Sequence, residues 1–172
     1  MPDLEASLSA NRQAVASFLS KARSVASTPW AQPVAAGKWS PAQIADHVAV
    51  AYEVAFRALK GDKTMGSAPR FLRPIVRAVG FTKILTKGAF PAKMKGPPVF
   101  APSAAHQPYD ASAARMEAAL AKLESEARAM AHAGRHAFEH PYFGRVDVSD
   151  YVRFSELHTK HHEQQLPGSP RA

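Results

Sequence analysis

Apolar residues recur every three or four positions in four stretches of the chain, which is the spacing of an amphipathic α-helix. The first stretch covers about residues 3–27, the second about 41–60, the third about 109–134 and the fourth about 148–166. Alternating strand patterns are almost absent, and no segment is repeated. Four long helices with apolar faces of this width predict an all-α fold, a four-helix bundle.

The residues at the ends of these stretches support the predicted boundaries. Ser40 is a good N-cap for the second helix, and Gln43 stands three positions later, as a capping box requires. Gly134 is expected to end the third helix, because glycine commonly follows a helix C-terminus. Asp147 or Ser149 is expected to cap the fourth helix.

A long crossover, about residues 61–108, separates the second helix from the third. It is rich in proline, and helical spacing is limited to the stretch RFLRPIVRAVGFTKILTKG. Pro74 and Gly80 interrupt even this stretch, so we expect only short helices within the crossover. Residues 167–172 are expected to form a frayed tail, and residues 1–172 to form a single domain.

The bulk composition is that of a globular protein, with 172 residues of which 46% are hydrophobic. There is no cysteine, so a metal would need nitrogen or oxygen ligands. No run of about 18 apolar residues predicts a membrane span, and the N-terminus does not resemble a secretory signal. We therefore expect a cytoplasmic protein.

The formal net charge of +8 arises in one segment, Lys60 to Lys95, which holds nine basic residues and one acid, while the remainder carries 13 of each. No nucleic-acid motif accompanies this charge, so binding to nucleic acid is not expected. The nearby Phe71, Phe81 and Phe90 alternate with aliphatic residues, as packing residues do. A basic segment of this kind usually forms a solvated face. The alternative is that it attracts an anionic substrate.

Two histidines near the C-terminus have the spacing of a helical metal chelate. His158 and His162 are four residues apart, so both rings project from one face of a helix, one turn apart. His161 points about 100° away from that face. Such a pair is a weak signal by itself, because eight histidines produce such spacings by chance.

A second run, HAGRHAFEH, places His132, His136 and His140 at the same spacing. Gly134 lies within the run and Pro141 follows it, so a continuous helix is not expected there. We interpret this run as a solvated helix end. The HPYFG sequence that overlaps it is interpreted as a tight turn whose aromatic side chains pack on the bundle.

His47 lies on the apolar stripe of the second helix, with Ile44, Val48 and Ala51. A buried imidazole there needs a partner. One alternative is a core histidine bonded to a backbone or side-chain group. The other is a site of three nitrogens, in which His47 meets His158 and His162 across the bundle.

The stretches KWSPAQIADHV and HPYFGRVDVSDYVRFSELHTKHHEQQL resemble the DinB-like (YfiT-like) family of metal-binding four-helix bundles. The resemblance covers about residues 4–166 in architecture, and its specific motifs lie in those two stretches. In that family one histidine of the second helix and two of the fourth hold a metal ion. The matching residues are His47, His158 and His162, with supporting matches at Trp39, Asp46 and Gln165.

The resemblance implies a divalent transition metal in an open three-histidine site, with zinc, nickel, copper and iron all suited to imidazole ligands. It also implies an enzyme acting on a small molecule, either a transferase that uses a low-molecular-weight thiol or a metal-assisted hydrolase. The alternative is a non-catalytic metal- or ligand-binding bundle, and a homodimer is left open. No catalytic residue beyond the ligands is assigned. Tyr151 is interpreted as a core residue, and Asp46 as the partner of a neighbour.

Overall fold

The computed structural model describes residues 3–25, 30–33, 35–62, 64, 66–91, 100–102 and 107–168. These residues form four long helices, a short helical segment and a small hairpin. In chain order the elements are α1 (Leu4–Val25), α2 (Pro41–Leu59), α3 (Arg73–Val76), the π-helical segment η2 (Arg77–Thr82), α4 (Lys83–Lys87), α5 (Tyr109–His132), β1 (Ala137–His140), β2 (Gly144–Asp147) and α6 (Val148–Glu163). The predicted all-α bundle is confirmed.

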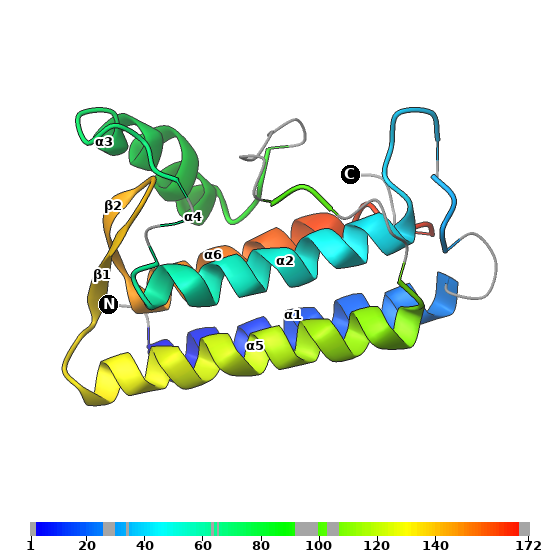
Figure 1. Ribbon diagram of the computed structural model, residues 1–172, viewed down its shortest axis with the longest axis horizontal. Helices are drawn as coiled ribbons and strands as arrows, with labels where there is room; N and C mark the ends of the chain where they lie inside the picture. Colours follow the sequence, from blue (N-terminus) through cyan, green and yellow to red (C-terminus); the bar gives the residue numbers. More distant parts are fainter. Residues whose placement is uncertain are drawn as a thin grey trace.

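The bundle consists of two pairs of helices, in which α1 packs against α6 and α2 packs against α5. The members of each pair run in the same direction, as the sequence colours in Figure 1 show. Because α2 and α5 are parallel, the chain must return along the bundle between them. The 19 residues of α2 span about 28 Å at 1.5 Å per residue, which accounts for the long connection.

The predicted start of α2 is confirmed in detail. The Ser40 hydroxyl accepts a hydrogen bond from the Gln43 backbone N–H at 3.2 Å, and the Gln43 side chain accepts one from the Ser40 N–H at 2.9 Å. At the other predicted boundary, α5 ends at His132 and Gly134 follows with a φ of 69°. This left-handed conformation is accessible to glycine at little cost.

A two-stranded antiparallel hairpin, which the sequence did not predict, joins α5 to α6. Its register pairs Ala137 with Asp147 and His140 with Gly144. Each strand has only four residues, which is too short for alternation to be visible in the sequence. The turn predicted at HPYFG is present, and it connects the two strands of this hairpin. Asp147 occupies the N-cap position of α6 without a side-chain capping bond.

The crossover contains short helices, as predicted, and its aromatic residues behave differently from one another. Phe81 is buried and stacks on Phe154 of α6, with ring centroids 5.2 Å apart. Phe90 is partly buried against the same ring. The prediction that Phe71 packs is wrong, because its side chain is 78% exposed. Of the crossover lysines, Lys63, Lys93 and Lys95 lie outside the described residues, as does the tail from residue 169.

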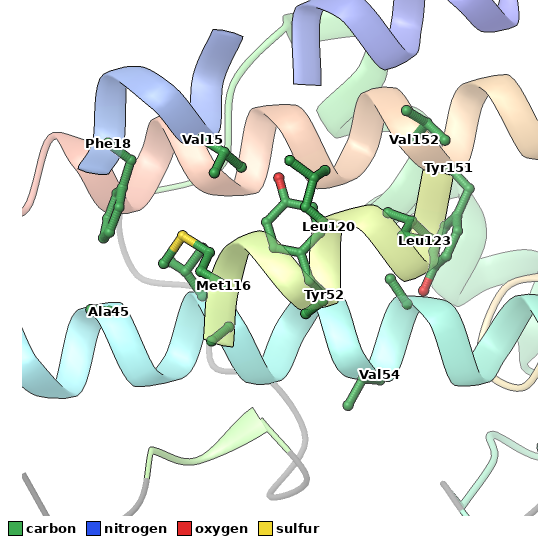
Figure 2. Packing of buried hydrophobic residues seen from close by; sticks show 14 of the residues in the cluster. Val15, Phe18, Ala45, Tyr52, Val54, Met116, Leu120, Leu123, Tyr151 and Val152 are labelled. Carbon is green, nitrogen blue, oxygen red and sulfur yellow. The ribbon is translucent and has the colours of Figure 1, made fainter. Parts of the chain in front are cut away.

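Apolar side chains of all four long helices fill the core. Figure 2 shows Phe18, Met116 and Tyr151 pointing into the space between the helices. The Tyr52 hydroxyl makes polar contacts within this core, lying 2.6 Å from Asn11 Oδ1 and 2.8 Å from Thr159 Oγ1. It ties α2 to both α1 and α6. None of the helices in the described ranges is long and apolar enough to cross a membrane.

Candidate metal centre

Helix direction brings the three predicted histidines together. His47 lies in the first half of α2, and His158 and His162 lie in the last two turns of α6. The two helices run in opposite directions, so the start of α2 lies beside the end of α6 (Figure 1). His47 and His162 are buried and His158 is partly buried.

The rings meet through their Nε2 atoms. His158 Nε2 lies 3.2 Å from His47 Nε2 and 3.1 Å from His162 Nε2, and the three ligand atoms all lie within 4.8 Å of one another. Two nitrogens that bind one ion at about 2.0–2.1 Å with tetrahedral geometry are about 3.3 Å apart. The two separations from His158 Nε2, 3.2 Å and 3.1 Å, are close to that value.

Hydrogen bonds at the far side of two rings define which nitrogen carries the proton. His47 Nδ1 lies 2.5 Å from the Phe100 carbonyl oxygen, and His162 Nδ1 lies 3.0 Å from Gln165 Oε1. Both oxygens are acceptors, so each Nδ1 donates and each Nε2 keeps a lone pair.

The Nε2 atoms of His47 and His162 are therefore both acceptors, and both lie next to His158 Nε2. A single N–H at His158 Nε2 cannot form a good hydrogen bond to both neighbours at once. A cation placed between the three nitrogens would satisfy all of them. Outer hydrogen bonds of this kind orient the imidazoles in metal sites.

All three imidazoles are held neutral. Burial lowers the pKa of His47, lowers that of His158 well below its ordinary value, and lowers that of His162 to about 3. The neighbouring histidines lower the pKa of His158 and His162 further, since a second positive charge would be repelled. The neutral ring is the form that binds metals.

Aromatic rings surround the cluster. Trp39 lies against His47 with ring centroids 4.8 Å apart, and Phe90 lies 5.2 Å from His158. The Phe100 ring lies 6.5 Å from His47. These side chains come from the segment before α2 and from the crossover, and they reduce the access of water to the nitrogens.

Asp46 turns away from the cluster, as predicted. Its carboxylate forms an ion pair with Arg115 of α5, which also binds Glu53 at 2.7 Å. Asp46 therefore joins α2 to α5 and does not lie in the group of ligand atoms. His161 is also outside that group, and Gln165 Nε2 lies 2.9 Å from its Nε2.

The second histidine run does not form a cluster. His132 ends α5, His136 precedes β1, and His140 is buried in β1, so the continuous helix that chelation requires is absent from this described segment. His140 lies 3.3 Å from the Tyr151 hydroxyl. Tyr151 precedes His158 by seven residues, or about 10 Å along α6, so His140 remains remote from the candidate metal centre. Tyr151 is buried in the core, as predicted.

The contact of Phe100 with His47 was not visible in the sequence, and Phe90 was expected only as a packing residue and not as a neighbour of His158. Both lie in the crossover, where no periodic pattern indicates which residues face the bundle. The Phe100 contact is made by a backbone carbonyl, which every residue carries. Trp39 and Gln165, by contrast, were indicated by the resemblance.

Comparison with known proteins agrees with this architecture. The profile of the DinB superfamily matches residues 3–166. No curated protein and no solved structure is significantly similar to the chain. The family match spans all four long helices and includes the three clustered histidines. The chain therefore belongs to the DinB superfamily.

Proposed function

We propose that the protein is a metal-dependent enzyme whose ion is held by His47, His158 and His162. The observation that carries the proposal is the convergence of three Nε2 atoms, two of them with lone pairs that outer hydrogen bonds direct inward. Membership of the DinB superfamily supports it. Zinc, nickel and iron all suit three imidazole ligands.

The donor set favours catalysis over a purely structural role. Three neutral ligands leave the charge of a divalent ion uncompensated and leave at least one coordination position open, as in catalytic zinc sites. Such an ion supplies Lewis-acid chemistry, which polarises a carbonyl or stabilises a thiolate. The reaction that we propose is transfer of a low-molecular-weight thiol to an electrophile, with metal-assisted hydrolysis as the second candidate.

The chain's own residues have separate roles in this proposal. The Phe100 carbonyl and Gln165 orient two of the ligands. Trp39 and Phe90 exclude water from the ligand nitrogens and offer apolar surface to a small substrate. Trp39 retains 37% of its exposure, so it is placed where a substrate can approach.

Metal content tests the ligand assignment. Untagged protein analysed by inductively coupled plasma mass spectrometry is expected to contain about one transition-metal ion per chain. His47→Ala and His158→Ala are expected to lose it, while His161→Ala, a matched change next to His162, is expected to retain it. Metal that persists in both ligand variants would refute the assignment.

Turnover tests the enzymatic part separately. Metal-loaded protein is incubated with a panel of low-molecular-weight thiols and electrophilic acceptors, and loss of free thiol is measured. Thiol consumption that depends on the metal and disappears in His158→Ala supports the transferase. Ester or amide hydrolysis with the same dependence supports the hydrolase. A metal-loaded protein that is silent in both panels favours the non-catalytic binding bundle.

A further inference from the structure

A hollow lined in part by arginines lies at the opposite end of α6 from the three histidines. There the short helical segment α3–η2 packs beside the β1–β2 hairpin, and the hollow, of about 370 Å³, lies between them. Its lining includes Arg145 of β2, two residues after the hairpin turn. His158 is ten residues into α6, or about 15 Å along the helix axis, so this hollow is separate from the candidate metal centre.

Four arginines line the hollow, namely Arg70, Arg73, Arg77 and Arg145. Glu139 is the acidic residue of the lining, so the wall carries a formal charge of +3. The positive field extends into the hairpin, where the charge of Arg73 adds to burial in lowering the pKa of His140. A hollow of this size lies at the lower end of the range for small-molecule sites, about 300–1,000 Å³.

Among the described residues, no carboxylate lies within ion-pair distance of these four arginines, and the same is true of Arg23 and Arg153. The charge of Arg77 acts on Asp150 of α6 from beyond that distance. Arg12, Arg57, Arg115 and Arg128 all pair with an acid. Arg73 Nε donates a hydrogen bond to the Ala68 carbonyl oxygen at 3.1 Å. That bond orients the Arg73 guanidinium through the backbone and leaves its charge uncompensated.

We propose that this arginine hollow binds a phosphoryl group. Guanidinium groups bind phosphate oxygens through paired N–H donors, and several around one hollow that are not ion-paired to a carboxylate favour a multiply charged anion. The group belongs either to a soluble phosphorylated molecule or to a lipid headgroup. The second source is included because Ile75 and Val79 of this helical segment are 59% and 62% exposed, and Phe71, two residues before it, is 78% exposed.

Titration calorimetry with inorganic phosphate and pyrophosphate tests the soluble source. Arg77→Glu is expected to weaken binding of these probes by about tenfold or more, since it replaces a charge-assisted donor with a repelling acid. Lys122→Glu is the matched control, because it makes the same change in net charge at an exposed position on α5. It is expected to alter affinity by less than about twofold at moderate salt, where distant surface charges are screened.

Sedimentation with phosphatidylcholine vesicles, with and without phosphatidylglycerol, tests the lipid source. Binding to the anionic vesicles that is lost in both Arg77→Glu and Phe71→Ser assigns the phosphoryl group to lipid. Binding of the soluble probes that is lost in Arg77→Glu and kept in Phe71→Ser assigns it to a soluble molecule.

Three controls keep the proposal open to refutation. Circular dichroism establishes that each variant is folded, and Arg145→Glu replaces Arg77→Glu if the latter does not fold. Phosphate bound at the histidine cluster is recognised because it is lost in His158→Ala and kept in Arg77→Glu, a result that overturns the arginine site. Equal effects of Arg77→Glu and Lys122→Glu, or no binding of any probe, also overturn it.

Discussion

The buried imidazole of His140 is expected to make the fold sensitive to acid. Its Nδ1 lies 3.1 Å and 3.3 Å from the backbone N–H groups of Tyr142 and Phe143, so this nitrogen accepts hydrogen bonds and must be unprotonated. Its ring stacks on Phe143 with centroids 4.5 Å apart. Burial first, and then the charge of Arg73, lower its pKa to about 3. His140 thus holds the hairpin turn only in its neutral form.

The sign and size of the effect follow from proton linkage. The pKa in the folded state, about 3, lies below the value of about 6.5 for unfolded histidine, so between these limits the unfolded chain binds more protons. The stability that neutral His140 contributes is present above pH 6.5 and is lost as the pH falls towards 3. At pH 5, about 1.5 units below the unfolded pKa, the loss is about 2 kcal/mol at 1.36 kcal/mol per unit.

Urea unfolding at pH 7 and pH 5 measures this loss, with a chelator present so that bound metal does not contribute. Other groups titrate over this range, so the comparison is with His140→Asn, whose amide oxygen can accept from the turn and does not ionise. The variant is expected to be less stable at pH 7 but to lose about 2 kcal/mol less between the two pH values than the unaltered protein. Equal losses in both proteins would show that His140 is protonated in the folded state or exposed in it.

Three further outcomes test the fold and the metal. Ser40→Ala removes the acceptor for the Gln43 N–H and is expected to lower the free energy of unfolding by about 1 kcal/mol in denaturant titrations. Tyr52→Phe leaves the buried Asn11 carbonyl oxygen without this donor and is expected to cost about 1–3 kcal/mol, a loss that should shrink if Asn11→Leu is introduced as well. Removal of the metal by a chelator is expected to lower the melting temperature of the loaded protein, and re-addition of the ion to restore it.

Local patterns predicted the long helices because their causes are local. The capping box at Ser40 and the apolar stripe of α2 are properties of neighbouring residues, and the structure confirms both. The hairpin was missed for the converse reason. Its four-residue strands are stabilised by pairing with each other and by packing of Val146 in the core. Neither contact produces a periodic pattern of apolar residues in the sequence.

The candidate metal centre likewise has one part that follows from local sequence and one part that depends on tertiary packing. The four-residue spacing of His158 and His162 places both rings on one face of α6, which any helix would do. Whether His47 met them depended on helix direction and packing. The residues alone favoured a core histidine, and the family resemblance changed the preference to a three-histidine site. The metal itself stays a prediction, and the geometry sharpens it to three Nε2 atoms.

The sequence by itself determined where the long helices begin and end, which faces are apolar and which two histidines share a face, because these depend on residues within a few positions of one another. Only the tertiary structure brought the Phe100 carbonyl to His47 and arranged four arginines around one hollow. Those contacts join segments that are distant along the chain. They depend on the path of a proline-rich crossover, which packing of the whole bundle decides.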